Sequence, residues 1–100
     1  MKNKLLSLMG IAMKARKLEY GYDTVSKSII SKNAKLIIMA SDLSQKSKRN
    51  IVLLSEKYKV ETLDINITMD EVYKSIGRKT GIVCINDVGF AEKILEFSGI

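Results

Sequence analysis

Apolar residues recur along the chain at two different spacings, which predict helices in some segments and strands in others. Near the N-terminus, Leu5 and Met9 begin a series of apolar residues at helical spacing, so a helix is predicted over about residues 3–16. By contrast, the runs Leu36–Ala40 and Gly81–Ile85 are apolar throughout. Continuous apolar runs of this length are typical of strands buried on both faces of a sheet.

Capping signals and shorter apolar patterns place the remaining elements. Thr68 and Glu71 have the spacing of a capping box, in which each side chain bonds the backbone amide of the other residue. Gly77 is a natural left-handed terminator for the helix that this box begins. The other predicted segments are strands at 18–20 and 60–63, and helices from 22 or 23 to about 32, from 45 to 57, and from 87 or 89 to 97.

Helices and strands therefore alternate from the first predicted helix to the last. Regular alternation implies helices on both faces of one sheet. The fold class predicted is α/β, as a three-layer α/β/α sandwich with a central four-stranded mixed sheet. A chain of 100 residues is too short for two cores, and the pattern contains no repeat or linker, so residues 1–100 are predicted to form one domain.

Positive charge is concentrated in the first half of the sequence. The chain has 17 Lys and Arg against 11 Asp and Glu, for a net charge of +6. Residues 1–50 carry eleven basic against three acidic residues, whereas residues 51–100 carry six against eight. This asymmetry favours a face that meets a polyanion, with a basic surface that serves solubility as the alternative.

The N-terminal segment superficially resembles a signal peptide, because Lys2 and Lys4 precede a short apolar run. However, Lys14, Arg16 and Lys17 follow that run at once, without a small-x-small cleavage site. No run approaches the roughly 20 apolar residues of a membrane span. The single cysteine also favours a reducing compartment, so a cytoplasmic protein without a membrane partner is predicted.

The usual signs of catalysis or of metal binding are weak in this sequence. There is no histidine, and Cys84 lies inside an apolar run, as expected for a small core residue. The segment 77–81 has glycines, a lysine and a threonine, but it leaves a helix and enters a strand, the reverse of a phosphate-binding loop. Asp70 and Glu71 are neighbours on a helix and point apart. We therefore expect no enzyme, no cofactor and no metal site.

The junction between the first two predicted helices offers chemistry suited to RNA. Gly21 allows close approach of a backbone or base edge, and free amides at the following helix start can bind acceptors. Asp23 could accept from a base amino or imino group. Lys27 lies four residues after Asp23, and a simple ion pair between these two side chains is an equally good interpretation.

These residues resemble a known family. The segment Gly21-Tyr22-Asp23-Thr24-Val25-Ser26-Lys27, followed by residues 34–42, is similar to the signature of the L7Ae superfamily of kink-turn-binding ribosomal proteins, Gly-x-Asn-Glu-Val-Thr-Lys and then Ala-x-Leu-Val-Val-Ile-Ala-x-Asp. Segments 75–77 and 86–91 extend the likeness along nearly the whole chain, which looks most like the small bacterial YlxQ-type members. The resemblance implies an α/β/α sandwich that binds RNA, without catalysis or cofactor.

The resemblance also assigns roles by position. Asp23 stands where the family has Asn, Thr24 stands where it has Glu, and Lys27 matches. An apolar family loop is replaced by Arg78-Lys79-Thr80, so general RNA binding is predicted more strongly than kink-turn specificity. The predicted RNA-binding residues are Gly21, Tyr22, Asp23, Thr24 and Lys27 for bases and turn backbone, and Lys14, Arg16, Lys17, Arg78 and Lys79 for phosphates.

The sequence thus predicts a monomeric, non-catalytic RNA-binding protein associated with ribosomal RNA or with ribosome assembly. The alternative is a protein-interaction module within a ribonucleoprotein, which would use the acidic second half or exposed apolar residues such as Phe97 and Ile100. A third hypothesis, a small enzyme acting on nucleotides or RNA, requires a pocket with perturbed titrating groups.

Overall fold

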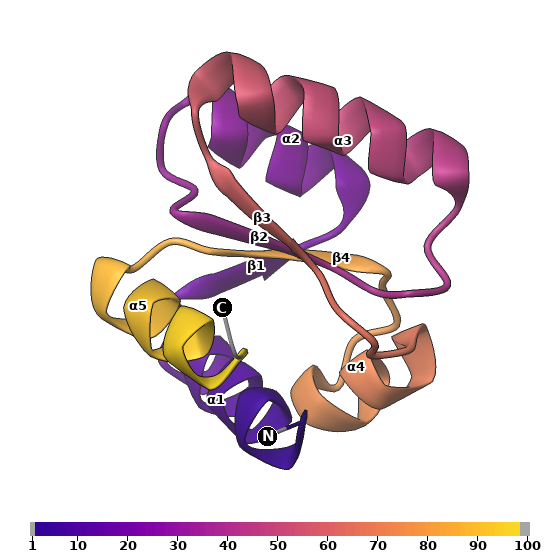
Figure 1. The fold of residues 1–100 in the computed structure, drawn as a ribbon. Helices are drawn as coiled ribbons and strands as arrows, with labels where there is room; N and C mark the ends of the chain where they lie inside the picture. The colour runs from indigo at the N-terminus through magenta and orange to yellow at the C-terminus, as the bar shows by residue number, and fades with distance from the viewer. Residues whose placement is uncertain (1, 99–100) are drawn as a thin grey trace.

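The computed structural model describes residues 2–98, in which helices and strands alternate along the chain (Figure 1). The helices are α1 (Lys2–Lys14), α2 (Tyr22–Ile30), α3 (Gln45–Tyr58), α4 (Met69–Ile76) and α5 (Val88–Phe97). The strands are β1 (Leu18–Tyr20), β2 (Leu36–Met39), β3 (Glu61–Asp64) and β4 (Ile82–Ile85). Each predicted element is present, in the predicted order.

The four strands form one mixed sheet in the order β1-β4-β2-β3. Strand β4 pairs antiparallel with both β1 and β2, and β2 pairs parallel with β3. The two strands predicted to be fully buried, β2 and β4, are the two central ones, so helices can cover both of their faces. The prediction of a mixed four-stranded sheet is confirmed.

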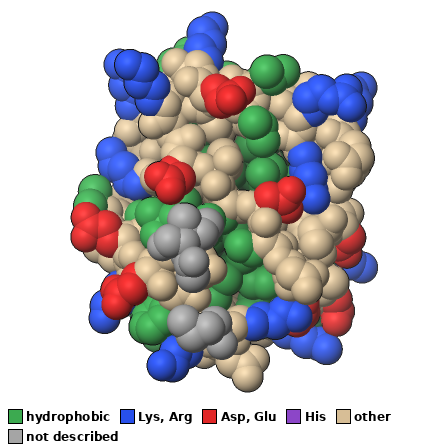
Figure 2. All heavy atoms as spheres, viewed as in Figure 1, with side chains coloured by type: hydrophobic (Ala, Val, Ile, Leu, Met, Phe, Trp, Pro, Cys, Tyr) green, Lys and Arg blue, Asp and Glu red, His purple; other side chains and the backbone are tan. Residues whose placement is uncertain are grey.

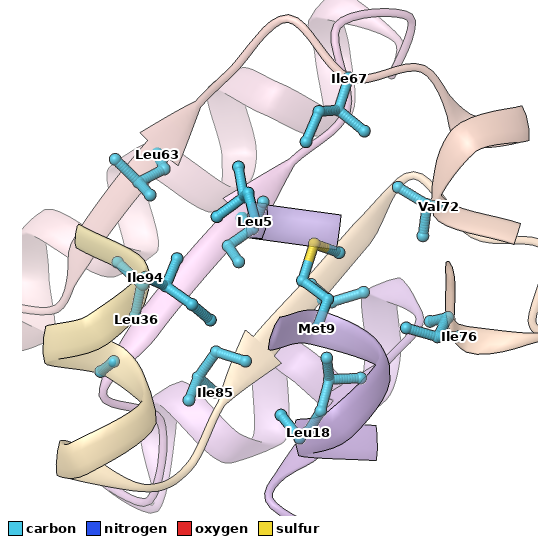
Figure 3. Packing of buried hydrophobic residues seen from close by; sticks show 14 of the residues in the cluster. Leu5, Met9, Leu18, Leu36, Leu63, Ile67, Val72, Ile76, Ile85 and Ile94 are labelled. Atoms are coloured by element: carbon cyan, nitrogen blue, oxygen red, sulfur yellow. The ribbon is translucent and has the colours of Figure 1, made fainter. Parts of the chain in front are cut away.

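Helices cover the sheet on both sides. Figure 1 shows α2 and α3 on one face and α1, α4 and α5 on the other. The side chains of β2 alternate between these layers: Leu36 and Ile38 join the core beneath α1, α4 and α5, whereas Ile37 and Met39 join the core beneath α2 and α3. Figure 3 shows the first of these cores, where Met9 of α1 is fully buried.

The helix ends follow the predicted capping signals, with one correction. Thr68 and Glu71 form the capping box at the start of α4, and Gly77 ends that helix with φ 75°. The amide of Thr68 and, after it, the Lys2 ammonium bond the Glu71 carboxylate and lower its pKa below the ordinary value. Helix α1, predicted to reach about residue 16, ends at Lys14 because Arg16 turns the chain with φ 60°.

Both α2 and α3 begin at the same end of the sheet. The amide of Gly21, just before α2, donates to the Ile82 carbonyl at 3.1 Å, and the Ala40 amide, shortly before α3, donates to the Gly81 carbonyl at 2.8 Å. The end of β1, the start of β4 and the end of β2 therefore meet here. We call this the Gly21 end, and define it by Gly21, Ala40, Gly81 and Ile82.

Three surface properties of the described residues concern the membrane, protein-interaction and polyanion hypotheses. None of the helices within residues 2–98 has the length and hydropathy needed to cross a membrane. Phe97 is half-buried, with the Lys4 ammonium 5.2 Å from the centre of its ring, and Ile100 lies outside the described residues. On the face drawn in Figure 2, acidic and basic side chains are interspersed around a strip of hydrophobic ones, so positive charge is not gathered there.

Candidate nucleic-acid interface

Gly21 gives the chain a sharp entry into α2. It has φ 92° and ψ 146°, its amide donates to the Ile82 carbonyl of β4, and its carbonyl accepts from Val25 at 2.9 Å. As the N-cap residue it has no side chain to bond the first amides of the helix. These amides, at the positive end of the helix dipole, are therefore available to acceptor atoms of a ligand.

We expect that Gly21→Ala lowers the free energy of unfolding by about 1–2 kcal/mol, because an L-residue is strained at positive φ. A Cβ atom built at this position has nothing within 4 Å, so the cost comes from the backbone conformation and not from a clash. Urea denaturation measures the loss. The matched control is chemically synthesised protein with D-alanine at position 21, which favours positive φ and should lose less stability than the L-alanine variant. Equal losses in both variants would contradict this explanation.

The side chains that follow Gly21 are accessible. Tyr22, Asp23, Thr24 and Lys27 are all exposed on the first turns of α2. The ion pairs found within residues 2–98 are Lys2–Glu71, Lys48–Asp64 and Lys74–Asp70, and none joins Asp23 to Lys27. The sequence left two interpretations equal, a contact with RNA and an ion pair between Asp23 and Lys27. The ion pair is absent from residues 2–98, so both side chains are free for a ligand.

The loop between α4 and β4 lies beside Gly21. The Arg78 Nε donates to the Tyr20 hydroxyl at 2.9 Å, and the guanidinium lies 5.8 Å from the centre of that ring. Gly21 follows Tyr20 and donates its amide to the Ile82 carbonyl at the start of β4, so the exposed Arg78 and Lys79 lie at the same end of the sheet as the start of α2. Thr80 is instead buried and bonds the Ile82 backbone, which makes it part of the loop's internal structure.

The remaining predicted cations lie elsewhere. Lys14, Arg16 and Lys17 are exposed, but they precede β1, whereas Gly21 follows it. The Lys17 carbonyl accepts from the Asn86 amide at 2.8 Å, at the opposite end of the sheet from Ile82. With about 3.3 Å per strand residue, roughly 13 Å separates Lys17 from Gly21. The predicted residues thus form two groups, one at each end of β1.

Sequence reasoning did not include the start of α3 in the site. Lys46 and Arg49 are exposed on its first turns, at the Gly21 end. Lys48 already has partners within the protein, because its ammonium bonds the Ser41 carbonyl at 3.1 Å and the Asp64 carboxylate at 3.2 Å. The sequence shows that three cations lie close together at the start of α3. That this start lies beside α2, however, depends on the order of the strands, which the sequence does not show.

Groups suited to catalysis are scarce in the described part of the chain. Residues 2–98 contain no group of three His, Cys, Asp or Glu side chains that could hold a metal ion. Cys84 is fully buried. Burial raises the pKa of its thiol to about 11, against a smaller opposing effect of a Ser28 hydrogen bond, so the thiol is protonated and unreactive at neutral pH.

Comparisons with known proteins agree in both sequence and fold. The family model of the ribosomal protein L7Ae/L30e/S12e/Gadd45 family matches residues 3–94. An RNA-binding protein YlxQ of Enterococcus faecium is 30% identical over 95 residues, 95% of this chain and 91% of the relative. An RNA-binding protein YlxQ of Bacillus subtilis (strain 168) is 32% identical over 90 residues, 89% of each chain.

Solved structures show the same fold at lower sequence identity. A protein of unknown function from Bacillus halodurans superimposes with a TM-score of 0.91 at 24% identity, over 97% of this chain and 98% of that one. A 15.5kD RNA binding protein of Giardia lamblia superimposes with a TM-score of 0.77 at 17% identity, over 98% of this chain and 84% of that one. These two likenesses show that this chain shares its overall fold with both proteins.

Proposed function

The chain belongs to the ribosomal protein L7Ae/L30e/S12e/Gadd45 family, and from this premise we propose that it is a non-catalytic RNA-binding protein whose interface is the Gly21 end of the sheet. The proposed target is a structured, kinked RNA of the ribosome or of its assembly. Two relatives that match most of the chain are named RNA-binding proteins, which supports the class of ligand.

One observation carries the proposal. The uncapped start of α2 and the cationic loop before β4 are far apart in sequence, yet the Gly21 amide at the start of α2 bonds the Ile82 carbonyl, at the end of that loop, at 3.1 Å. Backbone amides, an exposed carboxylate at Asp23 and exposed cations therefore share one end of the molecule. This combination provides donors for phosphates and an acceptor for base amino groups, which are the two kinds of contact that RNA recognition requires.

The division of roles follows from side-chain chemistry. Lys27, Arg78 and Lys79 are exposed cations that would bond phosphates or base acceptors. Asp23 would accept from a base amino or imino group, and the first amides of α2 would bond a phosphate or carbonyl oxygen. Thr24 has only a short hydroxyl side chain, so it reaches a base edge only if that edge lies directly against α2.

RNA affinity should fall steeply as salt is added. If about four phosphates are neutralised, a plot of log K against log salt concentration is expected to have a slope of roughly −3 to −4. Filter binding with a synthetic kink-turn hairpin measures it, with an uninterrupted RNA duplex of equal length as the control. The duplex should bind more weakly with a similar slope. A flat response to salt, or no binding of either RNA, would contradict the proposed function.

A further inference from the structure

A polar hollow lies between α2 and the edge strand β1, and it extends past the C-terminal end of α2. Its volume is about 270 Å³, and it is lined by Glu19, Thr24, Lys27, Ser28, Ser31 and Asn33. This volume is slightly below the range of about 300–1,000 Å³ that is typical of ligand pockets, so the hollow has room for no more than one planar base. Two of its lining residues, Thr24 and Lys27, belong to the proposed interface.

The Glu19 carboxylate is held in place within this hollow. Its Oε1 accepts from the Asn86 Nδ2 at 2.7 Å. The Asn86 Oδ1 in turn accepts from the Ser28 hydroxyl at 3.2 Å and from the Cys84 thiol at 3.4 Å. Ser28 and Cys84 are buried, and their two donors leave the Asn86 amide only one orientation, with its NH₂ group toward Glu19.

This network positions a carboxylate that still has acceptor capacity. A carboxylate offers about four lone-pair sites, of which Asn86 occupies one. Glu19 is only half-buried, so its other lone pairs are accessible from the hollow. Lys27 lines the same hollow, and its exposed side chain ends in a cationic donor. The hollow therefore presents a carboxylate anchored through its Oε1 atom, together with a lysine side chain.

We propose that Glu19 recognises a guanine whose Watson–Crick edge is unpaired, an inference that rests on the proposed RNA-binding function. Along that edge guanine carries the donors N2–H and N1–H and then the acceptor O6. The two donors match the carboxylate of Glu19, and O6 matches the ammonium of Lys27. The other three bases lack two adjacent donors, so a carboxylate bonds them less well. Asn86 is the positioning residue that fixes the carboxylate.

The test combines a protein substitution with a base substitution. Glu19→Gln keeps an oxygen for Asn86 but removes the second acceptor, and inosine lacks the N2 amino group of guanine. Each guanine in the internal loop of a synthetic kink-turn hairpin is replaced in turn by inosine, and affinities are measured by fluorescence anisotropy. Wild type should bind one inosine-containing RNA about fivefold or more weakly than its parent. The Glu19→Gln protein should instead bind the parent RNA and this inosine-containing RNA with about equal affinity, because the two changes remove the same contact.

Glu56→Gln is the matched control, since it removes one exposed carboxylate on α3 without touching the hollow. It should keep the full inosine penalty. An inosine penalty in Glu19→Gln as large as in wild type, with unchanged thermal stability, would overturn the proposal while leaving RNA binding intact. Absence of binding by the wild-type protein would instead overturn the proposed function and this inference together.

Discussion

Reversing the charge of the α4–β4 loop with Arg78→Glu and Lys79→Glu is expected to weaken binding of a kink-turn hairpin about 100-fold. Both side chains are exposed, and the Gly21–Ile82 backbone bond keeps their loop at the same end of the sheet as the start of α2. An RNA seated on α2 would then place phosphates against two new carboxylates, and like charges facing each other across an interface cost several kcal/mol. Filter binding at fixed salt concentration measures the effect.

A control for this loss must change net charge by the same amount elsewhere. Lys57→Glu and Lys93→Glu meet that requirement on α3 and α5, at exposed positions outside the proposed interface. This pair of substitutions should cost less than fivefold, because charges beyond a Debye length are largely screened. Equal losses in the two double variants would show that net charge, and not the loop, governs binding. Circular dichroism checks that both variants remain folded.

Lys27→Ala should weaken RNA binding by about 1–3 kcal/mol if the ammonium contacts a base edge. The residue is exposed on α2 and makes no ion pair within residues 2–98, so truncation removes little that stabilises the fold. Lys57→Ala on α3 is the control and should leave affinity unchanged. An unchanged affinity in Lys27→Ala would remove this residue from the interface.

The salt dependence of the same variant separates two roles of Lys27. If its ammonium bonds a phosphate, one fewer counterion is released, and the slope of log K against log salt concentration becomes shallower by about 0.7–0.9. If it bonds a base, the affinity falls at every salt concentration while the slope is unchanged. The variant protein therefore distinguishes positioning contacts from sequence-reading contacts.

Local signals were enough to predict the elements of this fold. The continuous apolar runs identified β2 and β4, which are the central strands, because a strand covered on both faces has no polar positions. The capping box at Thr68 and the glycine at residue 77 bound α4 as predicted. Helix α1 was predicted about two residues too long, since periodicity gives no warning that Arg16 adopts a left-handed turn.

The spatial grouping of the site residues was only partly predictable. Sequence proximity suggested that Lys17 and Gly21 act together, but the strand between them places them at opposite ends of the sheet. Conversely, Arg78 lies beside Tyr20 because β4 is the neighbour of β1, a pairing that no local pattern encodes. The same non-local pairing places Asn86 against Glu19, so the hollow beside α2 was invisible before the strand order was known.

The shortness of β1 has a geometric consequence. Three residues of rigid strand, paired along their length with β4, fix the span between the cationic turn at Arg16 and Lys17 and the backbone opening at Gly21. The backbone at these two places is about 13 Å apart along the sheet edge, so a polynucleotide that touched both would have to follow that edge. The length of β1 therefore sets the spacing between the two groups of predicted RNA-binding residues.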